Sequence, residues 1–157
     1  MKFGIIGAGE IAHDFARAIR LCTAKEYTIE LLAIASREKS KAEAFAKEHE
    51  IPRACGSYKE LMEDPEVEGI YIAVPHNFHA EITKQCAEHH KAVLCEKPFV
   101  VNEAEAIDAL ACVRKNGVLF MEAMWTRFLP TVLKAKEWLA DGKIGELQLI
   151  DASFSFY

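Results

Sequence analysis

The stretch MKFGIIGAGEIA (residues 1–12) decides the fold, because an apolar run leads through a glycine turn into the start of a helix. Its second half fits the pattern G-x-G-x-x-G/A, in which a dinucleotide diphosphate rests on a helix N-terminus. Glycine permits the sharp turn and leaves the backbone bare toward the pyrophosphate, while a small third residue lets the helix pack closely on the strand. The stretch therefore predicts a dinucleotide site formed by Gly7, Ala8, Gly9, Glu10, Ile11 and Ala12.

A glycine turn of this kind is a weak signal by itself, because many such turns bind nothing. Here it follows an apolar strand and opens a helix in which Ile11, Phe15 and Ile19 recur at helical spacing, so these side chains should face the sheet. This context favours a dinucleotide over a purely structural turn. S-adenosylmethionine, bound by a methyltransferase, is the main alternative ligand.

Composition limits the classes of protein to consider. The chain has 157 residues, 51% of them hydrophobic, and a formal net charge of −5, which predicts one domain with its own core and no nucleic-acid partner. No apolar run is long enough to span a bilayer, and residues 1–6 lack the features of a signal peptide, so we expect no membrane partner and a cytoplasmic location. The five cysteines form no C-x-x-C pair, which predicts reduced thiols and no metal site.

Apolar strands alternate with amphipathic helices along the chain, with no linker or repeat between them. This alternation predicts the α/β class, and strands without polar alternation indicate a parallel sheet buried on both faces, a Rossmann-type doubly wound fold. Ser57 and Asn102, each three residues before a Glu, are expected to cap their helices. After the first strand and helix, strands are expected at residues 30–35, 53–56, 69–74, 92–95 and 118–124, and helices at 40–49, 58–62, 78–89, 103–115 and from Pro130 onward.

Ligands of parallel sheets bind at the carboxyl ends of the strands. The second strand ends in Ser36-Arg37 and lacks the Asp or Glu that an NAD-selective site usually places there for the ribose hydroxyl groups. Ser36 can donate to a phosphate oxygen, and the Arg37 guanidinium can pair with a 2′-phosphate or stack on adenine, with Lys39 and Lys41 adding positive charge. NADP is therefore favoured over NAD. The alternative is that Arg37 merely opens a solvated loop, with Glu38 as the partner for the ribose.

Three stretches at strand ends, GAGEIA (7–12), VPHNFH (74–79) and EKP (96–98), resemble the glucose-fructose oxidoreductase/inositol dehydrogenase (Gfo/Idh/MocA) family. The match covers essentially the whole chain. Within the family, LCEKP (94–98) together with MEAMWTRF (121–128) is similar to the branch of dimeric dihydrodiol dehydrogenases and NADP-dependent D-xylose dehydrogenases. This double match is far more specific than the glycine turn.

The resemblance assigns the chemistry to Lys97, which would hydrogen-bond the reacting oxygen and stabilise alkoxide character while hydride moves to or from the nicotinamide. The alternative is a lysine that merely pairs with Glu96. His76 and His79 follow the fourth strand, and either could face the nicotinamide or the substrate as a proton-transfer group, with a role at the start of a helix as the alternative for each. The residues expected beside the cofactor at these two strand ends are Val74, Pro75, Glu96 and Lys97.

Trp125 and Arg127 follow the sixth strand and should flank the same crevice. Trp125 would form an aromatic wall for the substrate, and Arg127 would bind a cofactor phosphate or a substrate oxygen. Phe154 is a second candidate aromatic residue of the substrate pocket. Trp138, in the helix that starts near Pro130, is expected in the core with Val132, Leu133 and Leu139.

Residues 1–124 are expected to form the dinucleotide-binding domain, and residues 125–157 a connecting helix and the first strand of a missing C-terminal α/β domain. In the resembling family, that domain binds the substrate and forms the homo-oligomer. We therefore expect the NADP-binding part of an oxidoreductase acting on a sugar, a polyol or a cyclic trans-dihydrodiol, with little or no turnover by this chain alone. A nucleotide-binding sensor without chemistry of its own is the alternative.

Overall fold

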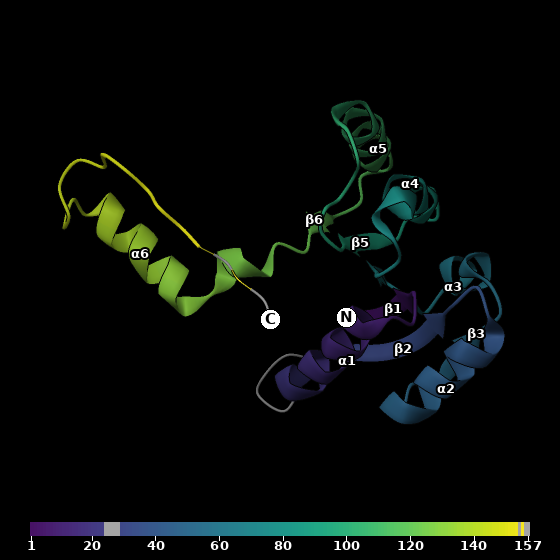
Figure 1. Cartoon of the computed structure of the whole chain (residues 1–157). Helices are drawn as coiled ribbons and strands as arrows, with labels where there is room; N and C mark the ends of the chain where they lie inside the picture. The colour runs from purple at the N-terminus through teal and green to yellow at the C-terminus, as the bar shows by residue number, and fades with distance from the viewer. Residues whose placement is uncertain (24–28, 154, 156–157) are drawn as a thin grey trace. The chain divides into compact units, whose positions relative to one another are not determined.

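The computed structural model describes residues 1–23, 29–153 and 155 and divides the chain into two units, Met1–Ala123 and Met124–Tyr157 (Figure 1). The first unit is built on a six-stranded sheet in which every neighbouring pair of strands is parallel, in the order β3-β2-β1-β4-β5-β6. This is the strand order of the Rossmann fold, so the predicted fold class is confirmed. The strands are β1 (Lys2–Ile6), β2 (Glu30–Ala35), β3 (Arg53–Cys55), β4 (Gly69–Ile72), β5 (Ala92–Cys95) and β6 (Phe120–Glu122).

The helices of the first unit cover both faces of the sheet. Buried side chains of α1 and α2 share one hydrophobic cluster with β1, β2 and β4, while those of α3, α4 and α5 belong to a second cluster. None of the helices in the described residues has the length and apolar content needed to cross a membrane. The helices are α1 (Glu10–Thr23), α2 (Lys39–His49), α3 (Tyr58–Glu63), α4 (His79–Glu88) and α5 (Glu103–Asn116), with a 3-10 turn, η1 (His76–Phe78), before α4.

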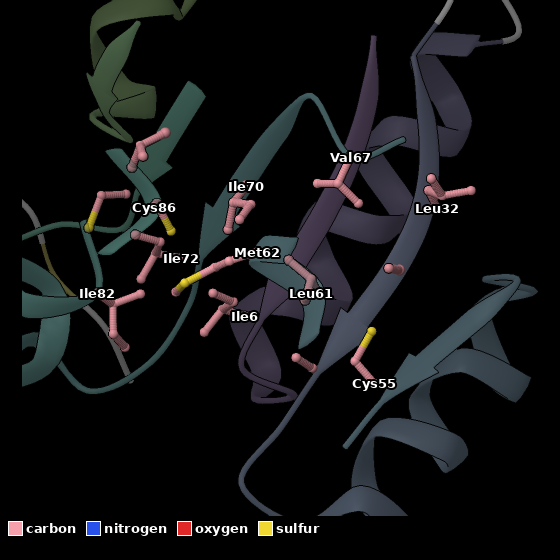
Figure 2. Close-up of a cluster of buried hydrophobic side chains, with 14 of the residues drawn as sticks. Ile6, Leu32, Cys55, Leu61, Met62, Val67, Ile70, Ile72, Ile82 and Cys86 are labelled. Carbon is pink, nitrogen blue, oxygen red and sulfur yellow. The ribbon is translucent and has the colours of Figure 1, made fainter. Parts of the chain in front are cut away.

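Burial on both faces explains why the strands lack polar alternation. Ile5 and Ile6 are neighbours on the central strand and both are fully buried, Ile5 in the cluster with α1 and α2 and Ile6 in the other. Figure 2 shows Ile6 together with Leu61 and Met62 of α3 and Ile82 of α4. A strand whose side chains meet helices on both sides needs apolar residues at every position.

Local capping follows the sequence closely. Ser57 accepts a hydrogen bond on its Oγ from the backbone N–H of Glu60 (3.1 Å), and the Glu60 carboxylate accepts one from the backbone N–H of Gly56 (2.7 Å). Asn102 accepts one on its side-chain oxygen from the backbone N–H of Glu105 (3.0 Å). Both predicted helix caps are therefore confirmed, and they fix where α3 and α5 begin.

The inward face of α1 differs from the one predicted. Ile11 is 41% exposed, whereas Ala12 and Ala16 are buried and Phe15 is half-buried. The turn at Gly7 brings the helix so close to the sheet that methyl groups occupy the line of closest contact. The larger side chain of Ile11, one position before Ala12, is therefore rotated toward solvent.

The thiols fit the expectation of reduced cysteines. All five are free, and Cys55, Cys86 and Cys95 are buried. Burial raises the pKa of the Cys55 thiol to about 11 and that of Cys95 to about 12, so both stay protonated at neutral pH.

The second unit contains a 3-10 turn, η2 (Trp125–Phe128), and the helix α6 (Pro130–Ala140). The expectation of a core around Trp138 is wrong, because this side chain is 46% exposed and Leu133 is 49% exposed. The part of this unit that the structure describes, with one α-helix and one extended segment, cannot enclose a core. Residues 146–153 also form no strand, since the described part of this unit offers no second strand with which they could pair.

Candidate dinucleotide-binding site

Gly7 lies where the ends of three strands converge. Its φ is +103°, and a Cβ at this position would lie 2.3 Å from the carbonyl oxygen of Ala73 at the end of β4. Its backbone N–H donates to the carbonyl oxygen of Ala35 at the end of β2 (2.9 Å). Only glycine combines this backbone angle with this lack of space.

Gly9, unlike Gly7, is not crowded by neighbouring protein atoms. A Cβ there would meet no protein atom within 4 Å, so the space in front of the backbone is open. The next residue, Glu10, begins α1, and the first N–H groups of an α-helix have no partner within the helix. An open glycine beside such N–H groups fits a diphosphate, as the sequence pattern requires.

A cavity of about 220 Å³ lies over this turn, at the carboxyl ends of β1, β2 and β4. Of the residues predicted at the turn, Glu10, Ile11 and Ala12 do not line it; Ile11 points to solvent and Ala12 packs on the sheet. Two lining residues, Tyr58 and Ala73, were not expected from the sequence. The full lining is Gly7, Ala8, Gly9, Ser36, Arg37, Glu38, Lys41, Tyr58, Ala73, Val74 and Pro75.

The end of β2 supplies the charged wall of the cavity. Arg37 is exposed, and the Glu38 carboxylate accepts a hydrogen bond from the Lys41 ammonium (2.7 Å). Burial raises the pKa of Tyr58, and the nearby Arg37 guanidinium offsets part of that rise. Tyr58 directly follows the capping Ser57, just past the carboxyl end of the short strand β3, and this position is the sequence signal that could have identified it as a site residue.

The Tyr71–Glu96 pair holds the chain at the end of β5. The Tyr71 hydroxyl donates to the buried Glu96 carboxylate (2.7 Å), whose second oxygen accepts from the backbone N–H of Lys97 (3.1 Å). Burial and this carboxylate raise the pKa of Tyr71, so it remains a donor. The peptide bond between Lys97 and Pro98 is cis.

The Lys97 side chain itself is exposed, and among the described residues its ammonium makes no ion pair. Glu96 is engaged by a phenol and a backbone N–H, so the alternative of a Lys97–Glu96 ion pair is not what the structure contains. On the other side of the loop, the backbone N–H of Phe99 donates to the Glu122 carboxylate (2.8 Å). Two carboxylates thus fix the backbone that carries a free ammonium group.

The two histidines after β4 have different surroundings. His79 is 1% exposed, with Nε2 lying 2.8 Å from the carbonyl oxygen of Val74 and Nδ1 lying 2.9 Å from that of Pro98. Both ring nitrogens are therefore occupied by backbone, which contradicts the expectation that His79 faces a substrate. His76 is exposed in η1, directly after the cavity residue Pro75.

The remaining predicted site residues lie outside the first unit. Trp125 and Arg127 are exposed on η2 of the second unit. Phe154 lies outside the described residues.

The doubly wound sheet and the open glycine turn define a dinucleotide-binding domain. Residues 1–124 match the oxidoreductase family with an NAD-binding Rossmann fold, and the chain belongs to this family. The resemblance drawn from the glycine turn and the EKP sequence is thereby confirmed. The cofactor of the domain is accordingly a nicotinamide dinucleotide.

Relatives of known activity match the chain along nearly its whole length. A trans-1,2-dihydrobenzene-1,2-diol dehydrogenase from Bos taurus is 44% identical over 154 residues, which is 98% of this chain and 45% of the bovine protein. The enzyme of the same name from Mus musculus is 42% identical over 156 residues, 99% of this chain and 46% of its own. The chain thus spans less than half the length of these relatives.

Solved structures of longer proteins also match nearly the whole chain. An NAD-binding oxidoreductase from Klebsiella pneumoniae has a TM-score of 0.87 at 31% identity, covering 93% of this chain and 40% of that protein. A 3-ketoreductase from Actinomadura kijaniata, in complex with NADP and TDP-benzene, has a TM-score of 0.82 at 29% identity, covering 93% of this chain and 44% of its own.

Proposed function

We propose that the chain is the NADP-binding half of a dehydrogenase that transfers hydride between NADP and a cyclic trans-dihydrodiol, a sugar or a polyol. The observation that carries the choice of NADP is the charge at the end of β2. Arg37 and Lys41 line the cavity beside the glycine turn, and Glu38 in the same lining is paired with Lys41. The Arg37 guanidinium is therefore available to pair with the 2′-phosphate of NADP. The similar 3-ketoreductase with bound NADP supports NADP as the cofactor.

Lys97 is the proposed catalytic residue. Its backbone is held by Glu96 while its ammonium is exposed, so it can donate a hydrogen bond to the reacting substrate oxygen and stabilise negative charge there. Bound NADP would supply or accept the hydride. His76, exposed beside the cavity, is the proposed group for moving a proton, and His79 keeps only a role in holding the backbone.

The substrate side of the reaction is proposed to lie largely outside the described residues. The relatives are about twice as long as this chain, and their names favour a trans-dihydrodiol as substrate. In this proposal a boundary near residue 124 separates the cofactor domain from segments that bind the substrate and form the homo-oligomer. Trp125 and Phe154 would contact the substrate, and Arg127 would bind a cofactor phosphate or a substrate oxygen. The exposed Phe128, Leu149 and Ile150 support such a covering domain, and the free thiols support a cytoplasmic location.

Calorimetric titration of the chain with NADP, NAD and S-adenosylmethionine tests the cofactor. We expect NADP to bind most tightly and Arg37→Asp to weaken NADP by about 10- to 100-fold, with a smaller effect on NAD, because a hydrogen bond between charged groups is lost. Arg114→Asp, an exposed arginine on α5, is the matched control and should change neither affinity. Equal binding of NAD, or tighter binding of S-adenosylmethionine, would overturn the proposal.

The enzyme and the sensor alternatives differ in turnover. If a longer form of the protein continues past residue 157, it should oxidise a trans-dihydrodiol or D-xylose with NADP, while the 157-residue chain should only bind the cofactor. In the longer protein, Lys97→Met should abolish turnover and leave NADP affinity within about threefold, whereas Lys115→Met should affect neither. A longer protein that binds NADP but oxidises none of these alcohols would favour the sensor.

A further inference from the structure

A cluster of three potential metal ligands joins α1 to α2, away from the nucleotide cavity and independent of the proposed reaction. Nδ1 of His13 lies 2.7 Å from Nε2 of His49. Oε1 of Glu48 lies 3.4 Å from the first of these nitrogens and 3.5 Å from the second. One potential donor atom from each of the three residues thus lies within 4.8 Å of the other two.

The two imidazole rings are held in place by the packing of the helices. His13 belongs to the second turn of α1, and His49 ends α2. The buried ring of Phe45 lies beneath both, with centroid distances of 4.4 Å to His13 and 4.5 Å to His49. The His49 side chain is only 5% exposed and that of His13 21%, so the site is largely formed before any ligand arrives.

The distances between the donor atoms suit a tetrahedral ion. Zinc binds imidazole nitrogen at about 2.0–2.1 Å and carboxylate oxygen at about 2.0–2.2 Å, which places tetrahedral ligands roughly 3.3–3.5 Å apart. The two distances to Glu48 already have this length. The two nitrogens, which share one proton in the hydrogen-bonded pair, need to separate by roughly 0.6 Å to reach the same spacing.

Local charge is compatible with a cation. The Glu48 carboxylate is more than half exposed and turns toward the two imidazoles. The positive charges of Arg17 and Arg20 near the site are offset by carboxylates, because Arg17 forms an ion pair with Asp14 (3.0 Å) and Arg20 with Glu50 (3.7 Å). Two imidazoles and one carboxylate are the ligands that zinc and related transition metals prefer over magnesium or calcium.

We propose that His13, Glu48 and His49 bind one divalent transition-metal ion, zinc in particular, with water in the fourth position. On binding, the proton between the two rings moves to a ring nitrogen that faces away, so both lone pairs point at the ion. The ion then links α1, which begins at the glycine turn, to α2, which begins just after Ser36 and Arg37. Its effect is to stabilise the half of the domain that carries the nucleotide cavity.

Cobalt(II) and zinc titrations of the 157-residue chain, free of any polyhistidine tag, test the site. We expect one ion per chain, a tetrahedral cobalt spectrum without a sulfur-to-metal band, and a melting temperature that rises with zinc. Glu48→Gln and His13→Gln should each weaken binding at least about tenfold, because loss of a ligand costs more than loss of an outer hydrogen-bond partner. Glu43→Gln changes the same charge elsewhere on the exposed side of α2 and should bind as tightly as the parent chain.

Three outcomes would overturn the proposal. One is the absence of stoichiometric binding, including binding seen only at millimolar metal. Another is equal affinity in Glu48→Gln and Glu43→Gln. The third is a cobalt spectrum that indicates cysteine ligands such as the exposed Cys22. Circular dichroism of each variant establishes that it is folded, and both substituted ligand residues are accessible enough for the fold to tolerate glutamine.

Discussion

Two glycines of one turn should respond to alanine in opposite ways. At Gly7, the added Cβ would lie 2.3 Å from the Ala73 carbonyl oxygen, so the backbone would have to move by about 1 Å to reach an ordinary contact. At Gly9, the added Cβ would touch no protein atom within 4 Å. Gly7→Ala should therefore harm the fold, while Gly9→Ala should harm only the ligand site.

The cost of Gly7→Ala follows from its surroundings. Its φ of +103° is strained for any residue with a Cβ, which costs about 1–3 kcal/mol. Its N–H donates to Ala35, and the N–H of Ala73 donates to Ile6, so a shift of the backbone also strains bonds on both sides at about 1 kcal/mol each. We expect a total loss of about 3–5 kcal/mol, a large part of the stability of one domain.

Gly9→Ala should leave the unfolding free energy within about 1 kcal/mol of the parent chain, because the new methyl group meets open space. It should nevertheless weaken NADP, since that space is where the pyrophosphate approaches the backbone in the dinucleotide pattern. Urea denaturation measures the first quantity and calorimetric titration the second.

Two results would refute this reasoning. Gly7→Ala could unfold at the same urea concentration as the parent, which would mean that the contact with Ala73 is not present in solution. Gly9→Ala could lose as much stability as Gly7→Ala, or keep full NADP affinity, which would mean that the open space does not receive the ligand.

Three further variants test contacts around the site and the sheet. Tyr71→Phe removes the donor to the buried Glu96 carboxylate and should lower the unfolding free energy in urea by about 1.5–3 kcal/mol. His79→Ala leaves two backbone carbonyls without their partner and should cost about 2–5 kcal/mol in the same assay. Arg53 holds the pKa of the Glu66 carboxyl at about 2, below its ordinary 4.5. As the pH falls, the Glu66 carboxylate therefore becomes protonated in the unfolded chain before it does so in the folded chain. The stability that its ion pair contributes is complete above pH 4.5 and is lost as the pH falls to about 2. Arg53→Met should flatten the fall of the urea midpoint across that window.

Each of these variants has a matched control. Tyr58→Phe removes a hydroxyl from a half-buried ring and should cost clearly less than Tyr71→Phe; equal losses would contradict the role given to the carboxylate. His89→Ala, at the end of α4, should be nearly neutral, and a neutral His79→Ala would refute the backbone role. Arg17→Met removes an exposed arginine of α1 and should keep the acid slope, whereas an unchanged slope after Arg53→Met would show that Glu66 is held by other groups.

Much of the fold could be predicted because its signals are local. The bounds of β2 and β5 agree with expectation to the residue, and α3 and α5 start at their predicted caps. Apolar runs, capping side chains and glycine act on neighbours within a few residues, so a sequence displays them directly. Prediction was poorest in the second unit, where the expected core around Trp138 and the expected strand needed partners that the described residues do not supply.

The sequence by itself therefore determined the order of strands and helices, the glycine turn and the polar residues at the strand ends. The tertiary structure decided which of these groups are available. It buried His79 between two carbonyls, used Tyr71 to hold Glu96, and brought His13 against His49 across 36 positions. Such contacts depend on how each helix is rotated on the sheet, and a rotation by one residue, as at Ile11 and Ala12, exchanges a buried side chain for an exposed one.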